Sequence, residues 1–178
     1  MKRTNLLKKA ALMMTCAAML LIPSQTVQAE EMTQPEITFD TLYPFFVATN
    51  WSTFDETTQQ GAILLLADEI SEELGVETPK ITFDKNMSQT TAGQTILTNY
   101  EATEIQINAN LIYSGETAIR VISHELRHVW QTANCPWVFH SYVRPEESMN
   151  QYKKQDAEID ARNWEDYEYL KFLTAMRN

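Results

Sequence analysis

The pentapeptide His-Glu-Leu-Arg-His at residues 124–128 constrains this chain more than any other stretch. Two histidines four residues apart lie one turn apart on the same face of an α-helix, so both imidazoles can reach one tetrahedral zinc ion. The flanks predict that helix, because apolar residues recur every three or four positions and no Gly or Pro lies between Glu116 and Cys135. Glu125 can then take a proton from a metal-bound water.

A pentapeptide of this kind also arises by chance, and two histidines on a helix can be ordinary surface or core residues. The chain has 3 histidines in all, and two of them fall in this register with Glu125 between them. The predicted amphipathic helix supplies the context that such a motif requires. The sequence therefore favours a zinc site over an accidental match.

The first 29 residues have the composition of a secretory signal peptide. A basic start, including Lys2 and Arg3, precedes an apolar run over residues 10–22 and an A-x-A-like cleavage site at Val27-Gln28-Ala29. We expect cleavage after Ala29 and a secreted or periplasmic protein. No later segment approaches about 18 consecutive apolar residues, so we expect no membrane association after cleavage.

The charge of the expected mature chain excludes one class of partner. The full chain has 14 Lys and Arg against 24 Asp and Glu, and the signal peptide holds four of the basic residues and no acidic one. The formal charge therefore falls from −10 to −14 on cleavage. Such a chain would repel nucleic-acid phosphates. Cys135 is the one cysteine left, which excludes an intramolecular disulfide.

The remaining chain predicts a single α+β domain over residues 41–178, preceded by a flexible leader over 30–40, and we expect a monomer. A short helix or turn at 41–47 is followed by a helix that Thr53 and Glu56 cap and Gly75 ends. Strands are expected at 80–84, 94–100 and 103–108, the last two as a hairpin, and Ser114 caps the helix with the histidines. Residues 132–150 are expected to be irregular, and 152–176 to form a C-terminal helix. A short antiparallel or mixed sheet would pack against these two helices.

Two histidines leave zinc with two open positions, and a catalytic site normally has a third protein ligand. A third histidine six residues further on is excluded, because Asn134 occupies that position. Glu158 and Asp160 are the remaining candidates, and they point about 200° apart on a helix, so only one can meet the metal. Periodicity places Asp160 nearer the centre of the apolar face than Glu158, and this leaves both candidates open.

The combination HELRHVWQ and, 30 residues on, Glu158-Ile-Asp-Ala161 resembles the zincin metallopeptidases of the gluzincin type. The order of hairpin and then motif helix is similar to that of minimal zincins. The resemblance implies a zincin-like metallopeptidase domain that cleaves protein or peptide substrates. It makes His124, His128 and Glu158 the zinc ligands and Glu125 the general base. The strand around 104–108 would lie beside the cleft, where its free edge could pair with an extended substrate.

One position departs from the gluzincin pattern. The residue after the small alanine is commonly Asp or Asn and orients a ligand histidine, but here it is Arg162. That role could pass to Asp160, or Asp160 could itself be the third ligand. The departure also leaves room for a non-catalytic zinc-binding secreted protein or interaction module. His140 is the candidate for a contact to the anionic intermediate, and Arg127 is expected to face away from the metal and pair with an acid.

Overall fold

The computed structural model describes residues 38–99 and 101–177. The predicted signal peptide and residues 30–37 of the predicted leader lie outside the described residues. The first helix begins at Phe39, so residues 39 and 40 belong to that helix rather than to the leader. The helices are α2 (Phe39–Leu42), η1 (Tyr43–Phe46), α3 (Ala48–Trp51), α4 (Glu56–Leu74), α5 (Gly115–Asn134), η2 (Pro136–Phe139), α6 (Pro145–Tyr152) and α7 (Asp156–Ala175). The strands are β1 (Lys80–Asp84), β2 (Gly93–Thr98) and β3 (Glu101–Asn108).

The fold is α+β, as predicted, with a small mixed sheet in the order β1-β3-β2. Strand β1 pairs parallel to β3, and β2 pairs antiparallel to β3 as the predicted hairpin. β3 is the central strand, and its residues Ile105 and Ile107, which share one face, are fully buried. The predicted free edge at 104–108 is therefore wrong, because β3 is paired on both sides. Strand β2 pairs on one side only among the described residues, and it contacts α5.

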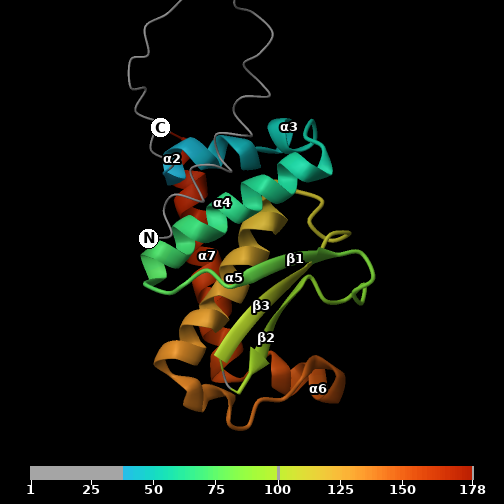
Figure 1. The fold of residues 1–178 in the computed structure, drawn as a ribbon, viewed down its shortest axis with the longest axis vertical. Helices are drawn as coiled ribbons and strands as arrows, with labels where there is room; N and C mark the ends of the chain where they lie inside the picture. The colour runs from blue at the N-terminus through green and yellow to red at the C-terminus, as the bar shows by residue number, and fades with distance from the viewer. Residues whose placement is uncertain (1–37, 100, 178) are drawn as a thin grey trace, which may run out of the picture. The chain divides into compact units, whose positions relative to one another are not determined.

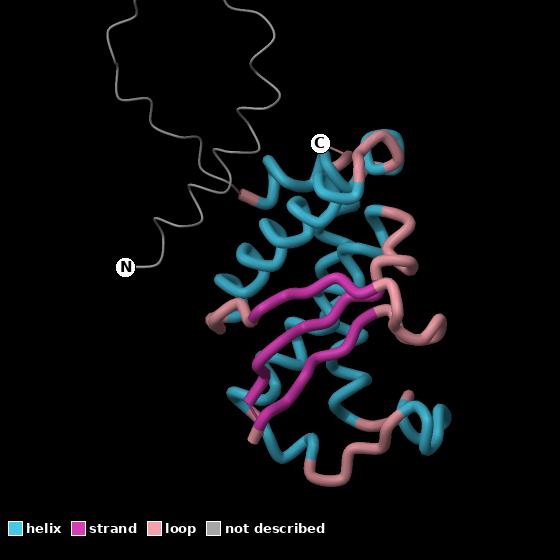
Figure 2. The backbone as a smooth tube through the Cα atoms, turned by 45° about the vertical axis from the view of Figure 1, so that its right-hand side comes forward, coloured by secondary structure: helices cyan, strands magenta, loops and turns pink. Residues whose placement is uncertain are grey.

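The core forms where α5 contacts α4, α7 and the strands β2 and β3. Figure 2 shows helical segments passing behind the three strands, and in Figure 1 α4 runs above β1. Ile119, Ile122 and Leu126 of α5 are at most 1% exposed, which confirms that the predicted apolar stripe faces inward. Ser114 caps α5 as predicted, accepting a hydrogen bond from the Thr117 N–H. No helix in the described ranges is long and apolar enough to cross a membrane.

The predicted start of α4 is shifted in the structure. The N-cap of α4 is Asp55, whose carboxylate accepts from the Thr58 N–H at 2.8 Å, whereas Thr53 bonds back to the Asn50 carbonyl. The turn that follows α3 occupies Thr53, so it cannot cap α4. Gly75 ends α4 in the left-handed conformation, as predicted.

The segment between α5 and α7 is more ordered than the sequence predicts. It contains η2 and α6, each with a proline at its start, where a missing N–H costs no helical hydrogen bond. Helix α7 begins at Asp156 rather than at residue 152. The amide of Gln155 pairs with both the N–H and the carbonyl of Val143, which ties the segment to the start of α7.

Candidate metal centre

Three side chains from two helices converge on one point. His124 and His128 of α5 and Glu158 in the first turn of α7 form a group whose ligand atoms lie within 4.8 Å of one another, and this group could hold a metal ion. The two histidine Nε2 atoms are 3.1 Å apart. Glu158 Oε2 lies 3.3 Å from His124 Nε2, and Glu158 Oε1 lies 3.1 Å from His128 Nε2. Ligand atoms on a tetrahedral zinc are about 3.3–3.4 Å apart for bonds of about 2.0–2.1 Å, so the donor set fits that ion.

Glu158 and not Asp160 belongs to this group. Glu158 is fully buried, and its neighbours Ala157 and Ala161 are also fully buried where α7 meets α5. The predicted position of Asp160 near the centre of the buried face is wrong, because its side chain is 43% exposed. Small side chains on α7 bring its backbone close to α5, and this contact sets the buried face more strongly than the large side chains further along the helix. Asp160 instead pairs with Arg127, as expected for that arginine.

The outer nitrogens of both histidines have acceptors. His124 Nδ1 lies 2.9 Å from Glu165 Oε2, and His128 Nδ1 lies 2.8 Å from Gln131 Oε1. Each acceptor can hold a proton on Nδ1, which would leave the lone pair of Nε2 for a metal ion at the centre, as in metal-bound histidines. Sequence reasoning did not assign Glu165 or Gln131 to the site. The spacing carried a signal, since Gln131 is three residues after His128 and Glu165 is seven residues after Glu158.

The electrostatics of the group favour a bound cation. Burial lowers the pKa of His124, but hydrogen bonds to Glu158 and Glu165 outweigh it and raise that pKa to about 10. Burial raises the pKa of Glu158, but hydrogen bonds from His124 and His128 hold it far below its usual range. The Glu158 carboxylate at the centre therefore stays ionised, and a positive charge beside it is favourable. A divalent ion supplies this charge while leaving both imidazoles neutral.

Glu125 lies beside the centre and against β2. Its side chain is buried, and the Thr95 hydroxyl donates to its Oε2 at 2.7 Å. Its negative charge raises the pKa of Tyr142 and of Tyr152, after larger contributions that include burial and Glu158. No signal in the sequence indicated Thr95, because it meets Glu125 only through the packing of β2 on α5.

Two further groups contact the Glu158 carboxylate. The Tyr142 hydroxyl donates to Oε1, and Arg162 Nη1 lies 3.5 Å from Oε2. The ring of Phe139 packs against His128 with centroids 5.9 Å apart. His140 is exposed at the end of η2 and is not part of the group that could hold a metal. The residue of this segment that the structure brings to the centre is therefore Tyr142 and not the predicted His140.

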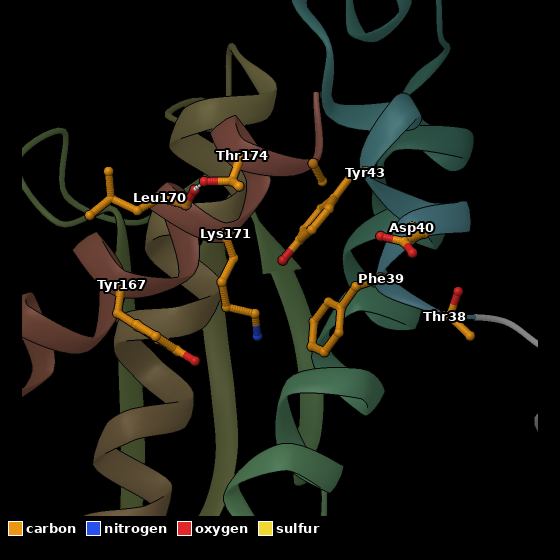
Figure 3. Close-up of a pocket in the computed structure, with 9 residues that line it drawn as sticks. Thr38, Phe39, Asp40, Tyr43, Tyr167, Leu170, Lys171 and Thr174 are labelled. Carbon is orange, nitrogen blue, oxygen red and sulfur yellow. Dashed lines mark hydrogen bonds between the residues drawn. The ribbon is translucent and has the colours of Figure 1, made fainter. Parts of the chain in front are cut away.

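A separate groove of about 660 Å³ lies between α2 and the C-terminal half of α7. It shares no residue with the metal centre, and Figure 3 shows Lys171 between the rings of Phe39 and Tyr167. The Lys171 ammonium lies 4.0 Å from the Phe39 ring centroid and forms ion pairs with Glu73 and Glu168. The groove is therefore built around a lysine whose charge is already neutralised.

Comparison with known protein families, curated proteins and solved structures found no match to this chain. What the centre can do chemically therefore follows from its own donor atoms and the groups that hold them.

Proposed function

We propose that this protein is a secreted, zinc-dependent metallopeptidase-like hydrolase that cleaves peptide bonds. The observation that carries the proposal is the convergence of two imidazole Nε2 atoms and one buried carboxylate beside a second carboxylate, that of Glu125. Two histidines and one glutamate leave one tetrahedral position for water or substrate, which is the arrangement of a catalytic rather than a structural zinc site.

Each protein group has a distinct role in the proposed reaction. Zinc held by His124, His128 and Glu158 would polarise the scissile carbonyl and lower the pKa of a bound water. Glu125 accepts the proton of that water and then donates it to the leaving amine. Thr95 fixes Oε2 of Glu125, which leaves Oε1 for the proton transfer. Because Glu125 is buried, its carboxylate does not need to shed bulk water before it reacts.

The substrate would bind along β2 rather than β3. Strand β2 contacts α5, and Thr95 in its middle touches Glu125. The outer edge of β2 offers backbone N–H and C=O groups that an extended peptide can pair with. A protein or peptide segment added there would pass next to the general base. This requires an extended or unfolded stretch in the substrate.

Replacing Glu125 by Gln tests the proposal, with Glu116→Gln on the same helix as the matched control. Glu116 is half exposed and pairs with Arg120. Glu125→Gln should retain zinc near one equivalent and lose peptide hydrolysis by about 10²–10⁴-fold, the usual contribution of a general base. Glu116→Gln should behave like wild type. Equal hydrolysis by wild type and Glu125→Gln would refute the assignment of the base.

Arg162 favours a second candidate, a non-catalytic zinc-binding secreted protein or interaction module. Its guanidinium forms an ion pair with the Glu158 carboxylate, and this pairing reduces the negative charge that the carboxylate offers to a metal ion. Zinc binding by the wild-type chain without turnover on any peptide mixture would support this candidate.

Mass measurement of the exported chain tests the expected cleavage after Ala29.

A further inference from the structure

The side-chain amide of Gln131 lies between His128 and the first turn of α7. Gln131 is 1% exposed, and its Oε1 lies 2.8 Å from His128 Nδ1. An amide oxygen can only accept, so His128 must carry its proton on Nδ1. When a metal ion is bound, the lone pair for it is then on Nε2, the atom that lies 3.1 Å from both His124 Nε2 and Glu158 Oε1.

The amide of Gln131 is held in one of its two orientations. Its Nε2 donates to the Ala157 carbonyl at 2.9 Å and to Asp160 Oδ2 at 2.8 Å. A flipped amide would direct its oxygen at two acceptors, the Ala157 carbonyl and Asp160 Oδ2. Those contacts would be unfavourable in a buried position, so these two acceptors assign the orientation of the amide.

Asp160 is in turn held by a two-point ion pair. Arg127 donates from Nε to Oδ2 at 2.7 Å and from Nη2 to Oδ1 at 3.0 Å. The guanidinium carbon lies 3.8 Å from the Trp130 ring centroid and 5.2 Å from that of Trp164. The pair is electrically neutral, so the chain of contacts behind His128 adds no net charge. His124 differs, because its outer nitrogen faces the Glu165 carboxylate.

We infer that Gln131 is a positioning residue that selects the metal-binding tautomer of His128, and that the Arg127–Asp160 pair acts on the metal through Gln131. The inference rests on the metal-binding half of the proposed function and not on peptide cleavage. It gives Asp160 a role two hydrogen bonds away from the metal, in place of the ligand role that its sequence position left open.

The first test compares Gln131→Leu with Asn134→Leu. Asn134 is a matched control on the same helix, since its amide also bonds a backbone carbonyl, that of Trp130, but it is exposed. Zinc affinity is measured by competition with a chromophoric chelator. Gln131→Leu should bind Zn²⁺ about 10–100-fold more weakly, the usual effect of losing a hydrogen-bond partner of a ligand histidine. Asn134→Leu should stay within about 2-fold of wild type.

A rescue experiment separates orientation from packing. Gln131→Glu keeps an acceptor for His128 but sets a carboxylate against Asp160, so it should weaken Zn²⁺ binding. In the double variant Gln131→Glu/Asp160→Asn, the amide of the new asparagine can donate to the carboxylate introduced at residue 131. This variant should bind Zn²⁺ about 10-fold more tightly than Gln131→Glu alone. Equal affinities for the single and the double variant would overturn the inference, even where Gln131→Leu fails to fold.

Long-range ¹H–¹⁵N spectra of metal-free protein give a readout that does not depend on zinc or on hydrolysis. Wild type and the double variant should show His128 protonated on Nδ1, and Gln131→Leu, which has no acceptor for that proton, should show a mixture of tautomers. A wild-type His128 protonated on Nε2 alone would refute the role of Gln131. A protein that binds zinc with this tautomer but cleaves no peptide would refute the proposed hydrolase and leave the inference standing.

Discussion

Gly93 of β2 lies directly against the side chain of Glu125. A Cβ atom at residue 93 would fall 2.9 Å from Cγ and Oε1 of Glu125 and equally close to Val121 Cγ1. Real Cβ atoms do not approach neighbours so closely, so the lack of a side chain at this strand position is what allows Glu125 to lie where it does. The position of the proposed general base thus depends on a glycine 32 residues earlier in the chain.

Replacing Gly93 by Ala should displace the Glu125 carboxylate from its observed position. We expect peptide hydrolysis to fall about 10–100-fold, because a displacement near 1 Å at a reacting group has an effect of that order. Zinc affinity should change little, since the three ligands do not touch residue 93. Thr98→Ala at the far end of β2 serves as the control. Wild-type hydrolysis by Gly93→Ala would show that Glu125 does not need its observed position.

The segment after η2 contains Tyr142 and His140, and we expect different effects from replacing each of them. Tyr142 donates a hydrogen bond to Glu158, whereas His140 is exposed. Tyr142→Phe should change zinc affinity or turnover by about 10–150-fold, because a hydrogen bond to a charged group contributes about 1.5–3 kcal/mol. His140→Ala should change neither by more than about 2-fold. A large loss of turnover in His140→Ala at unchanged zinc affinity would restore the contact to the anionic intermediate predicted from the sequence.

Removing the metal should lower the melting temperature without unfolding the domain. The core side chains Ile63, Leu66 and Ile70 of α4 are fully buried away from the three ligands, so the fold does not depend on the ion alone. Zinc at about 100 times its Kd should stabilise the protein by about 2.7 kcal/mol, or about 5–10 °C for a domain of this size. Calorimetry with and without a chelator measures this difference. In Glu158→Gln the difference should disappear, and its persistence would indicate a metal site elsewhere.

Glu168 should make the stability depend on pH. Burial raises its pKa to about 7 against the opposing effect of Lys171, compared with 4.5 in an unfolded chain. Below pH 4.5 both states are protonated and the contribution to stability is fully present. Between pH 4.5 and 7 the unfolded chain loses the proton while the folded chain keeps it, so the free energy of unfolding falls as pH rises. The loss amounts to about 3 kcal/mol at about 1.4 kcal/mol per pKa unit.

Urea unfolding of metal-depleted protein at pH 5 and pH 8 measures this loss, and Glu168→Gln is the comparison. The variant should become more stable relative to wild type as the pH rises, because it carries no proton to lose. Parallel pH dependence in the two proteins would show that Glu168 stays ionised in its ion pair with Lys171. Comparing the two proteins removes the contribution of the metal ligands, which both share.

The sequence by itself determined the local parts of this protein. The spacing of His124 and His128 requires a helix to bring them together, and the 3.6-residue period of α5 places them on one face. The hairpin of β2 and β3, the cap at Ser114 and the stop at Gly75 follow from residues close together in the chain. All of these depend on backbone geometry over a few residues, which composition and spacing specify.

The tertiary structure alone decided which acid completes the centre and what surrounds it. The resemblance to gluzincins indicated Glu158, whereas periodicity on α7 placed Asp160 nearer the buried face; close packing of Ala157 and Ala161 against α5 turned Glu158 inward. The contacts of Thr95 with Glu125 and of Glu165 with His124 join residues 30 and 41 positions apart. Such contacts are set by how whole elements pack, and packing depends on side-chain volumes at several places at once, which no local pattern records.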